Sequence, residues 1–303
     1  MEIGVGLGGG DLDAMVRNAR SLEERGFAFT GVANISGWDA IGALAIVGRE
    51  TERIELQTAV VPTYPRHPVT MAQQALTTQA AAGGRFTLGI GLSHQVVIEN
   101  SLGLSFARTA SHMREYLSVL MPLLHRERVR FEGEEYRVDS GLDAPDMQPV
   151  RCLVAALGPV MLRIAGEMAD GTATWMCGPK TLESHISPRI RKAAADAGRP
   201  EPTVSAALPI ALTSDPAAAR EQVSQQLAVY PTLPSYKAML DIEGIEQAGD
   251  IAILGDEETL DLALRRLEEA GVTQFSASVL DVEAGSSERT LDYLQSKLQA
   301  RKL

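Results

Sequence analysis

IELQTAVVPTYPRHPVTMAQQALTTQAAAGGRFTLGIGL, residues 54–92, predicts a strand, a loop, a helix and a second strand in succession. The first eight residues are rich in β-branched and apolar types, and Pro62 ends the strand because proline cannot donate to a ladder. Apolar residues then recur from Val69 to Ala80 at the spacings of a half-buried helix, which two glycines close. Residues 86–92 are again apolar. Two apolar strands joined through a helix predict a βαβ unit, whose strands are parallel and buried on both faces.

The rest of the chain repeats this alternation of apolar strand and helix. Eight such strands are predicted, at residues 2–7, 27–33, 54–61, 86–92, 152–157, 171–176, 204–213 and 273–280. Eight parallel strands with intervening helices close into a (β/α)8 barrel, the α/β fold that we expect here. An open, doubly wound parallel sheet is the alternative fold.

Two segments interrupt the alternation of strand and helix. Residues 126–147 alternate apolar and charged residues around Gly133, which predicts a small hairpin inserted on the barrel. Residues 228–250, with prolines at 231 and 234, predict an irregular or short-helical excursion after strand seven. Neither segment has the length of a second domain, so we expect a single barrel domain over residues 1–303.

The composition excludes several classes of protein. A net charge of −11 over 303 residues argues against nucleic acid and anionic membranes as partners. The first residues lack the basic segment of a signal peptide, and no apolar run reaches the ~18–20 residues of a membrane span. Cys152 and Cys177 lie in or near predicted buried strands, and we interpret them as free thiols of a reducing cytoplasm.

The site of such a barrel lies at the carboxyl ends of its strands. The predicted strand exits are residues 8–10, 34–38, 59–64, 93–95, 156–159, 175–180, 212–213 and 279–281. These exits are mostly small, apolar or amide-bearing, and Asp39 and Asp281 are the carboxylates at or beside them. Metal-dependent hydrolysis and two-carboxylate glycoside hydrolysis need more acidic and histidine side chains than this, and no metal site is expected. Backbone, glycine and flat apolar surface instead suit a large planar cofactor that brings its own reactivity.

Several motifs resemble the bacterial luciferase-like monooxygenase superfamily. They are Arg66-His67-Pro68, Ala72-Gln73-Gln74-Ala75, residues 84–91 (GRFTLGIG), Gly158-Pro159, Ala165-Gly166, Ala169-Asp170-Gly171, Gly255-Asp256 and Ala270-Gly271-Val272. The resemblance covers nearly the whole chain. One departure is Ala82-Gly83, where the family carries a polar residue before Gly-Arg-Phe, and we expect it to alter a helix end and not the chemistry.

The resemblance implies a flavin-type ring held across the barrel mouth. Members use either reduced FMN with oxygen or the deazaflavin coenzyme F420 with a hydride step. A tryptophan in the second loop and Gly-Pro after strands five and six are similar to the F420-dependent branch. The resemblance also implies a homodimer, and a non-proline cis peptide within Ala59-Val60-Val61 that forms a bulge behind the ring. From the residues alone, this segment is ordinary strand.

Three residues are assigned to catalysis. Asn34 is placed to hydrogen-bond a ring carbonyl or the reacting substrate oxygen, with a plain turn residue as the alternative. Trp38, in a glycine-flanked exit loop, is expected to wall the substrate side of the ring, although a lone tryptophan is often a core residue. His94 is a candidate proton donor or a residue that orients the cofactor, and its alternative is a loop histidine bonded to backbone.

Two Gly-Pro motifs open helices after strands five and six. At Gly158-Pro159 and Gly178-Pro179 we expect free N–H groups and the positive end of a helix dipole to bind the cofactor's phosphate. Lys180 is the expected charge partner, and ordinary turn chemistry is the alternative. The remaining cofactor-binding candidates are Ser93, Gln95 and Ala156. Tyr64 and the excursion are expected to line or cover the substrate pocket.

Three hypotheses for the function follow. The first is an oxidoreductase that transfers a hydride between coenzyme F420 and a small organic substrate. The second is a monooxygenase that uses reduced FMN and oxygen, because both cofactors share a ring shape and a phosphate. The third is a barrel without catalysis that binds a flavin or a small ligand, which the small number of acid–base groups favours.

Overall fold

The computed structural model of the chain describes residues 1–8 and 10–300. Its main sheet is a closed parallel barrel, with β12 pairing back onto β1. The barrel strands are β1 (Glu2–Gly6), β2 (Phe29–Val32), β3 (Glu55–Thr58), β5 (Phe86–Gly91), β8 (Arg151–Val154), β9 (Gly171–Trp175), β10 (Thr203–Leu212) and β12 (Gln274–Val279). Eight parallel strands in a closed barrel confirm the predicted (β/α)8 fold, and the alternative of an open, doubly wound sheet is not what the structure has.

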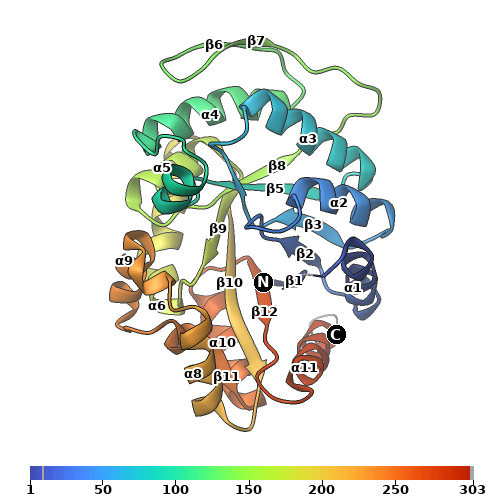
Figure 1. The fold of residues 1–303 in the computed structure, drawn as a ribbon, viewed down its shortest axis with the longest axis vertical. Coiled ribbons are helices and arrows are strands. Elements are labelled where there is room, and N and C mark those ends of the chain that lie inside the picture. The colour runs from blue at the N-terminus through green and yellow to red at the C-terminus, as the bar shows by residue number, and fades with distance from the viewer. Residues whose placement is uncertain (9, 301–303) are drawn as a thin grey trace.

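Helices surround the barrel on its outer side (Figure 1). The main ones are α1 (Leu12–Arg25), α2 (Ala40–Arg49), α3 (Pro68–Ala81), α4 (Thr109–Leu124), α5 (Pro159–Met168), α7 (Ser187–Asp196), α8 (Pro216–Gln226), α10 (Glu257–Glu269) and α11 (Ser286–Ala300). Asp11, Asp39 and Asp256 each cap a helix by accepting a hydrogen bond from its first turn, as N-cap residues do. Residue 9 of the predicted first exit and residues 301–303 lie outside the described residues.

The third strand differs from its prediction as continuous strand. It ends at Thr58, the Ala59–Val60 peptide bond is cis, and a short strand β4 (Val61–Pro62) continues the pairing with β5. The cis peptide that the resemblance implied is therefore confirmed. Across this interruption the Thr58 hydroxyl accepts from Gly89 N at 2.7 Å and donates to Gly89 O at 2.8 Å. One side chain thus replaces the backbone partner that a continuous strand would supply.

The glycines of β5 make room for this bulge. An added Cβ would lie 2.0 Å from the Thr58 carbonyl oxygen at Gly89, and 2.8 Å from a Val60 methyl at Gly91. Both are closer than side chains tolerate, so β5 needs glycine where β3 bulges over it. Residues 54–92 are therefore matched to each other across two strands.

The other predicted strands are confirmed, and most of them are shorter than predicted. The fifth, expected over 152–157, is β8 and ends at Val154, which leaves Ala155 to Gly158 as the exit loop. The predicted hairpin is confirmed as the antiparallel pair β6 (Val129–Glu132) and β7 (Arg137–Ser140), which projects from the barrel (Figure 1). The Glu115 carboxylate of α4 accepts from three backbone N–H groups of its turn, those of residues 134–136.

The excursion after β10 is a chain of short elements. It contains the 3-10 helix η3 (Tyr230–Thr232), α9 (Pro234–Glu243), the 3-10 helix η4 (Ala248–Ile251) and the strand β11 (Ile253–Gly255), which pairs with the end of β10. The sequence did not predict this strand. Two π-helices, η1 (Val96–Ser101) and η2 (Leu182–Ile186), and the short α6 (Pro179–Thr181) complete the elements.

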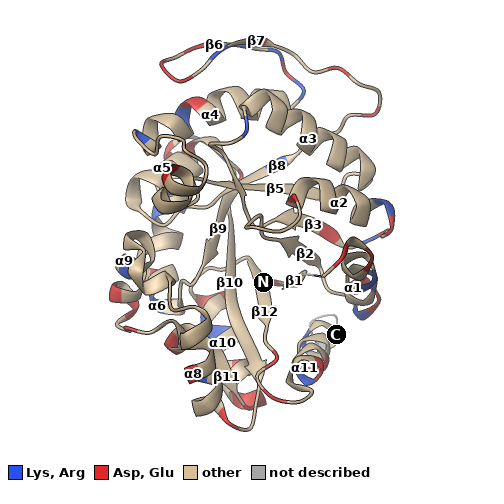
Figure 2. Ribbon diagram, in the orientation of Figure 1, with Lys and Arg blue, Asp and Glu red and all other residues tan. Residues whose placement is uncertain are grey.

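Charged side chains lie mainly on the outer helices, the loops and the hairpin, with few on the barrel strands (Figure 2). The core of the barrel is built from buried aliphatic and aromatic residues of the strands and of the inner helix faces, as apolar burial requires. In the described part of the chain, no helix has both the length and the apolar character that crossing a membrane would need.

Candidate functional site

The exits of β2, β3, β5 and β8 adjoin one another at one end of the barrel. Ala59 N donates to Val32 O at 2.8 Å, and Ala155 N donates to Ile90 O at 2.8 Å. The space above Gly91 is bounded by Val60 on one side and by Ala155 on the other. These exits therefore present a continuous surface of small and apolar groups, as a flat ring requires.

The three residues predicted to back the ring differ in their exposure. Ala59 is exposed and Val60 is half-buried, so both can offer side-chain surface to a ligand. The Val61 side chain is fully buried, so this residue can reach a ligand through its backbone only. The first two positions keep the role that the sequence analysis predicts, and Val61 supports them from the core.

Asn34 and Trp38 both fix the loop after β2. The Asn34 Oδ1 accepts from Ala40 N at 3.0 Å at the start of α2, which is the turn role considered as its alternative. The Trp38 Nε1 donates to Gly10 O at 3.0 Å, and its ring stays 52% exposed. Trp38 is therefore not a core residue, because it joins the first two exit loops and leaves a large aromatic surface open to solvent.

His94 lies among aromatic side chains that the sequence analysis did not connect with it. Its ring is 5.7 Å from that of Tyr236, which packs edge-on at 4.8 Å against Tyr230, and Tyr230 lies 6.1 Å from Trp175 of β9. Burial lowers the pKa of His94, which favours the neutral imidazole. No hydrogen bond of its ring nitrogens is found among the described residues. The alternative of a backbone-bonded loop histidine is therefore not what the structure shows.

Ser93 and Gln95, on either side of His94, have different surroundings. Ser93 adopts a φ of 62°, in the left-handed region that residues other than glycine seldom occupy, and the chain turns sharply there. Gln95 is exposed, and its Nε2 donates to the Glu99 carboxylate along η1 at 2.9 Å. The structure thus directs the Gln95 amide to its own helix, while the Ser93 hydroxyl has no partner among the described side chains.

The start of α5 is open for an anion. Its N-cap, Gly158, has no side chain to bond the first turn, and Pro159 occupies the first helical position. The N–H groups of Val160 and Met161 have no partner among the described residues, and the helix dipole adds positive potential there. Before the helix, the Ala156 side chain is buried, and the His185 Nε2 donates to Leu157 O at 2.7 Å, so the loop is held from η2.

The start of α6 is occupied, and the expectation of free N–H groups at Gly178-Pro179-Lys180 is wrong. The carboxylate of Glu243, the last residue of α9, accepts from Lys180 N at 3.2 Å, Thr181 N at 2.8 Å and the Thr181 hydroxyl at 2.7 Å. It also fills the space beside Gly178. Of the two predicted phosphate-binding helix starts, one is therefore open and the other is bonded to the excursion. The Lys180 side chain is exposed and has no ion pair in the described part of the chain.

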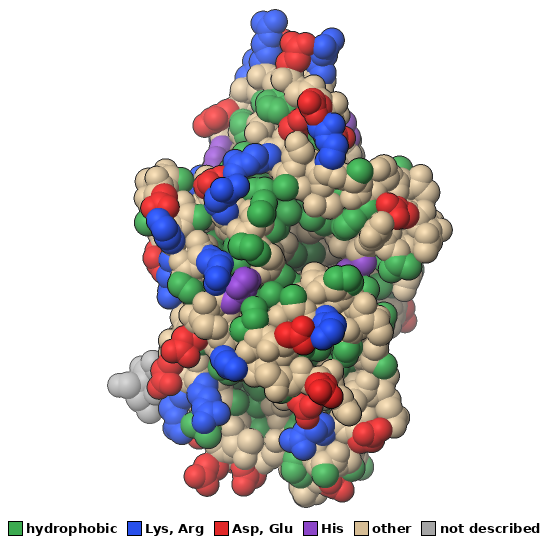
Figure 3. Space-filling model, turned by 90° about the vertical axis from the view of Figure 1, so that its left-hand side faces the viewer, with side chains coloured by type: hydrophobic (Ala, Val, Ile, Leu, Met, Phe, Trp, Pro, Cys, Tyr) green, Lys and Arg blue, Asp and Glu red, His purple; other side chains and the backbone are tan. Residues whose placement is uncertain are grey.

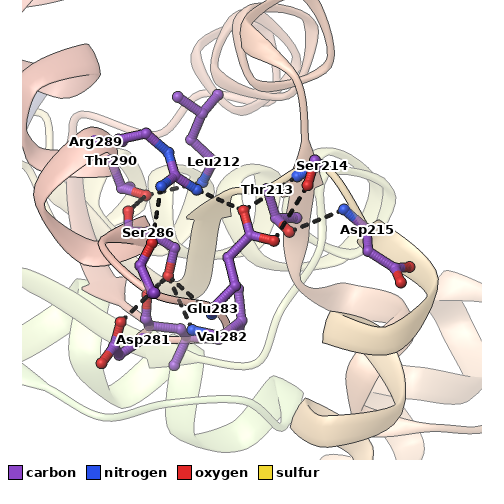
Figure 4. A network of polar contacts seen from close by, with 12 residues as sticks. Leu212, Thr213, Ser214, Asp215, Asp281, Val282, Glu283, Ser286, Arg289 and Thr290 are labelled. Atoms are coloured by element: carbon purple, nitrogen blue, oxygen red, sulfur yellow. Dashed lines mark hydrogen bonds and ion pairs between the residues drawn. The ribbon is translucent and has the colours of Figure 1, made fainter.

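The exits of β10 and β12 are tied to each other by side chains (Figure 4). The Glu283 carboxylate accepts from the backbone N–H and the hydroxyl of Ser214 and pairs with Arg289. Thr290 of α11 accepts from Leu212 N at 2.8 Å. An open cleft of about 660 Å³ lies beside this network. Its polar groups largely bond one another, so it is a weaker candidate than the opposite exits.

The loop after β4 packs into a buried aromatic cluster. Tyr64 stacks on His112 of α4 at 4.1 Å, and the His112 Nε2 lies 2.9 Å from the Thr63 hydroxyl. The Tyr64 hydroxyl is buried without a hydrogen-bond partner, and burial raises its pKa to about 12. Burial lowers the pKa of His112 to about 4. An unpartnered buried hydroxyl is costly, and such a group in a native structure calls for an explanation. The pocket-lining role that its position predicts for Tyr64 therefore stays a hypothesis.

The side of the molecule that carries α6 and α9 is hollowed near its middle (Figure 3). Hydrophobic side chains lie in the depth of the hollow, and histidine side chains lie on two sides of it. Over residues 1–8 and 10–300, no group of three or more His, Cys, Asp or Glu side chains could hold a metal ion. Cys152 and Cys177 are buried free thiols whose pKa burial raises, so neither is a reactive thiolate.

The residues that the excursion brings to the mouth could not be assigned from the sequence. Tyr230 and Tyr236 were covered only by the general expectation for this segment, and Glu243 was not considered. Two tyrosines beside Pro231 and Pro234, in a chain with 5% aromatic residues, were the available signal. No signal marks Glu243, because its hydrogen-bond partners lie about sixty residues earlier.

Comparisons with known proteins agree with this geometry. The family model for luciferase-like monooxygenases matches residues 2–289. An F420-dependent glucose-6-phosphate dehydrogenase of Nakamurella multipartita is 30% identical over 233 residues, 74% of this chain and 66% of that protein. The F420-dependent tetrahydromethanopterin reductase of Methanopyrus kandleri has a TM-score of 0.77 at 21% identity, over 97% of this chain and 98% of its own. The FMN complex of a 3,6-diketocamphane monooxygenase of Pseudomonas putida has a TM-score of 0.75 at 15% identity, over 97% and 96%.

The chain therefore belongs to the luciferase-like monooxygenase family, a class of oxidoreductases built on this barrel. The named sequence relatives include F420-dependent enzymes, while the structural relatives include users of both F420 and FMN.

Proposed function

We propose that this protein is an oxidoreductase that transfers a hydride between coenzyme F420 and a small organic substrate. The open start of α5, next to the apolar exits of β3 and β5, is the observation that carries the proposal. An anionic group fits the free N–H groups of Val160 and Met161, and a flat ring fits the surface of Ala59 and Val60. The F420-dependent relatives favour the deazaflavin over FMN.

The cofactor would be held by backbone more than by charge. Gly158 leaves room for a phosphate because no side chain caps α5, and nothing lies within 4 Å of the Cβ that a larger residue would add there. We propose the Lys180 ammonium as charge partner, since its side chain has no ion pair of its own in the described structure. When bound, F420 supplies a ring carbon that accepts or donates a hydride.

The protein's own groups would orient the substrate and move its proton. The neutral imidazole of His94 can accept a proton from a substrate hydroxyl or return one to a carbonyl oxygen. The Asn34 oxygen accepts from Ala40 N, while its amide N–H₂ has no hydrogen-bond partner among the described residues and can donate to a substrate oxygen. Trp38, Tyr230 and Tyr236 would exclude water from the ring.

The test of the cofactor site is a carboxylate placed at the α5 N-cap. Gly158 has backbone angles suited to a capping residue, so Gly158→Asp is expected to fold and to bond the N–H groups itself. We expect Gly158→Asp to bind F420 more than tenfold more weakly than wild type in a fluorescence titration. Gly158→Ala, which leaves the N–H groups free, is the control and should bind within about threefold of wild type. Equal binding by the two variants would place the phosphate elsewhere.

The FMN monooxygenase remains the second candidate, because an FMN-bound monooxygenase shares the fold. Titration of both cofactors separates the two. Binding of F420 with no response to FMN supports the proposal, whereas tight FMN binding with oxygen-dependent turnover supports the monooxygenase. If Asn34, Trp38 and His94 can each be replaced by alanine without loss of turnover, the assigned catalytic roles are wrong.

A further inference from the structure

Exposed hydrophobic side chains gather around the mouth of the barrel. Among the described residues, the large hydrophobic side chains that are highly exposed lie in the segments 35–38 and 96–104 and at Val160 and Val229, apart from two that lie elsewhere. The first three of these places follow the carboxyl ends of the barrel strands β2, β5 and β8. Val229 lies beyond α8, next to Tyr230, whose ring is 6.1 Å from that of Trp175 at the end of β9. We call this set the apolar rim. Single exposed apolar residues are normal, but a concentration at one end marks a binding surface.

The exposure within the apolar rim is high. Ile35 is 79% exposed, Val229 is 56% exposed and Val96 is 52% exposed. The hollow on the α6 and α9 side has hydrophobic side chains in its depth as well (Figure 3). Exposed apolar side chains at the strand exits, together with a hollow that has hydrophobic side chains in its depth, fit a small molecule that enters it, because burying that molecule removes apolar area on both sides from water.

Cations at the strand exits are almost all paired with carboxylates. Arg66 pairs with Asp39, Arg108 pairs with Glu134 and Glu135, and Lys237 pairs with Asp241. In the described exits, Lys180 is the cation without such a partner, and the proposed function uses it for the cofactor. A doubly charged substrate would meet no second free cation there, and the net charge of −11 would repel it.

We infer that the substrate of this site is an uncharged, largely apolar organic molecule, which the apolar rim collects and the hollow binds. The inference rests on the proposed function in taking this molecule to be the substrate of a hydride transfer. That an uncharged, apolar molecule binds at the mouth is inferred from the apolar rim and does not depend on the reaction. The apolar rim contributes attraction, and beside the start of α5 and Lys180, which the proposed function assigns to the cofactor, the paired cations leave no second site for a phosphate or carboxylate group. Polar groups in the strand-exit loops after β2 and β5, the amide of Asn34 and the imidazole of His94, are suited to one neutral oxygen.

The chain carries its own probe for such binding. Its two tryptophans are Trp38, in the loop after β2, and Trp175, at the end of β9. Both lie at strand exits, so the intrinsic fluorescence of the whole chain reports on the mouth. The matched ligands are 1-octanol and octyl phosphate, which share the apolar chain and differ in charge, with glucose 6-phosphate as a polar anion. Titrations are made with the protein alone and with F420 bound.

We expect 1-octanol to bind at least tenfold more tightly than octyl phosphate, and glucose 6-phosphate to give no saturable response. Val229→Asp in the apolar rim should weaken 1-octanol binding about tenfold, equivalent to about 1.4 kcal/mol. Leu262→Asp on α10 is the matched control, since Leu262 is also exposed, at 42%, but lies outside the rim, and it should leave binding unchanged.

Three results would overturn the inference. They are tighter binding of either phosphate ester than of 1-octanol, equal effects of the two aspartate variants, and loss of a dimer in Val229→Asp without loss of 1-octanol binding, which would make the rim a subunit interface. Failure of F420 to bind while 1-octanol still binds would refute the proposed function alone. F420 binding with no preference for 1-octanol would refute the inference alone.

Discussion

Replacement of Thr58 by valine tests whether one hydroxyl holds the third strand to its neighbour. Thr58 is fully buried, and its Oγ1 accepts from Gly89 N and donates to Gly89 O. Valine has the same shape, so Thr58→Val creates no cavity and removes both hydrogen bonds. The regular pairing of β3 with β5 is confined to Leu56 and Gln57 of β3. At Gly89 the backbone of β3 therefore supplies no ladder hydrogen bond that could replace those of the Thr58 hydroxyl.

The expected loss follows from the buried groups left behind. A buried N–H without a partner costs about 1–3 kcal/mol, and the carbonyl, which has a second lone pair, adds less. Thr58→Val should therefore lower the free energy of unfolding by about 2–3 kcal/mol. Thr58→Ser keeps the hydroxyl and loses one buried methyl group, so about 1 kcal/mol is expected.

Urea denaturation followed by far-UV circular dichroism measures these differences at constant m-value. The control is Thr77→Val, because Thr77 is exposed on α3 and its hydroxyl bonds only the Gln73 carbonyl of its own helix. That variant should stay within about 0.5 kcal/mol of wild type. A Thr58→Val protein as stable as Thr77→Val would refute the role assigned to this hydroxyl.

Two further predictions concern the excursion and the aromatic cluster. Glu243→Ala removes the carboxylate that bonds the start of α6, so limited proteolysis within 228–251 should become several-fold faster. Glu246→Ala is the control, because the Glu246 side chain is exposed and makes no hydrogen bond or ion pair with the described residues, and it should not change the rate. Equal cleavage of the two variants would show that Glu243 does not hold the segment. Burial lowers the pKa of His112 from 6.5 to about 4 in the folded protein. As the pH falls below 6.5, the unfolded chain binds a proton at this residue before the folded protein does, so the free energy of unfolding decreases. Between pH 7 and 5 wild type should lose about 2 kcal/mol more unfolding free energy than His112→Gln, and parallel losses in urea titrations at the two pH values would contradict this.

Local pattern decides the strands and helices because each buries one face against the barrel. Residues 54–92 predict two parallel strands around a helix from periodicity and proline alone, and the structure has them. The break at 59–60 is not visible in that pattern, because Ala and Val suit a strand, and only the resemblance predicted it. The expectations of one domain over 1–303 and of a homodimer stay predictions.

The candidate site is predicted in part because strand exits can be read from strand ends. Trp38, His94 and Gly158 lie at exits for that reason, and the structure leaves each of them accessible to a ligand. Gly178-Pro179 has the same pattern as Gly158-Pro159, yet its N–H groups bond Glu243. Two identical local motifs thus have different surroundings, and sequence spacing carries no information about a partner sixty residues away.

The amino-acid sequence by itself determined the barrel, the positions of its strand exits and the small, apolar character of those exits, because these depend on hydrophobic periodicity and on proline and glycine within single segments. Only the tertiary structure decided which helix start is open, which aromatic side chains meet His94, and that the exposed apolar residues form one rim. Those properties depend on contacts between segments far apart in the chain, and the excursion after β10 makes several of them. A site assembled from several strand exits is complete only when the barrel closes.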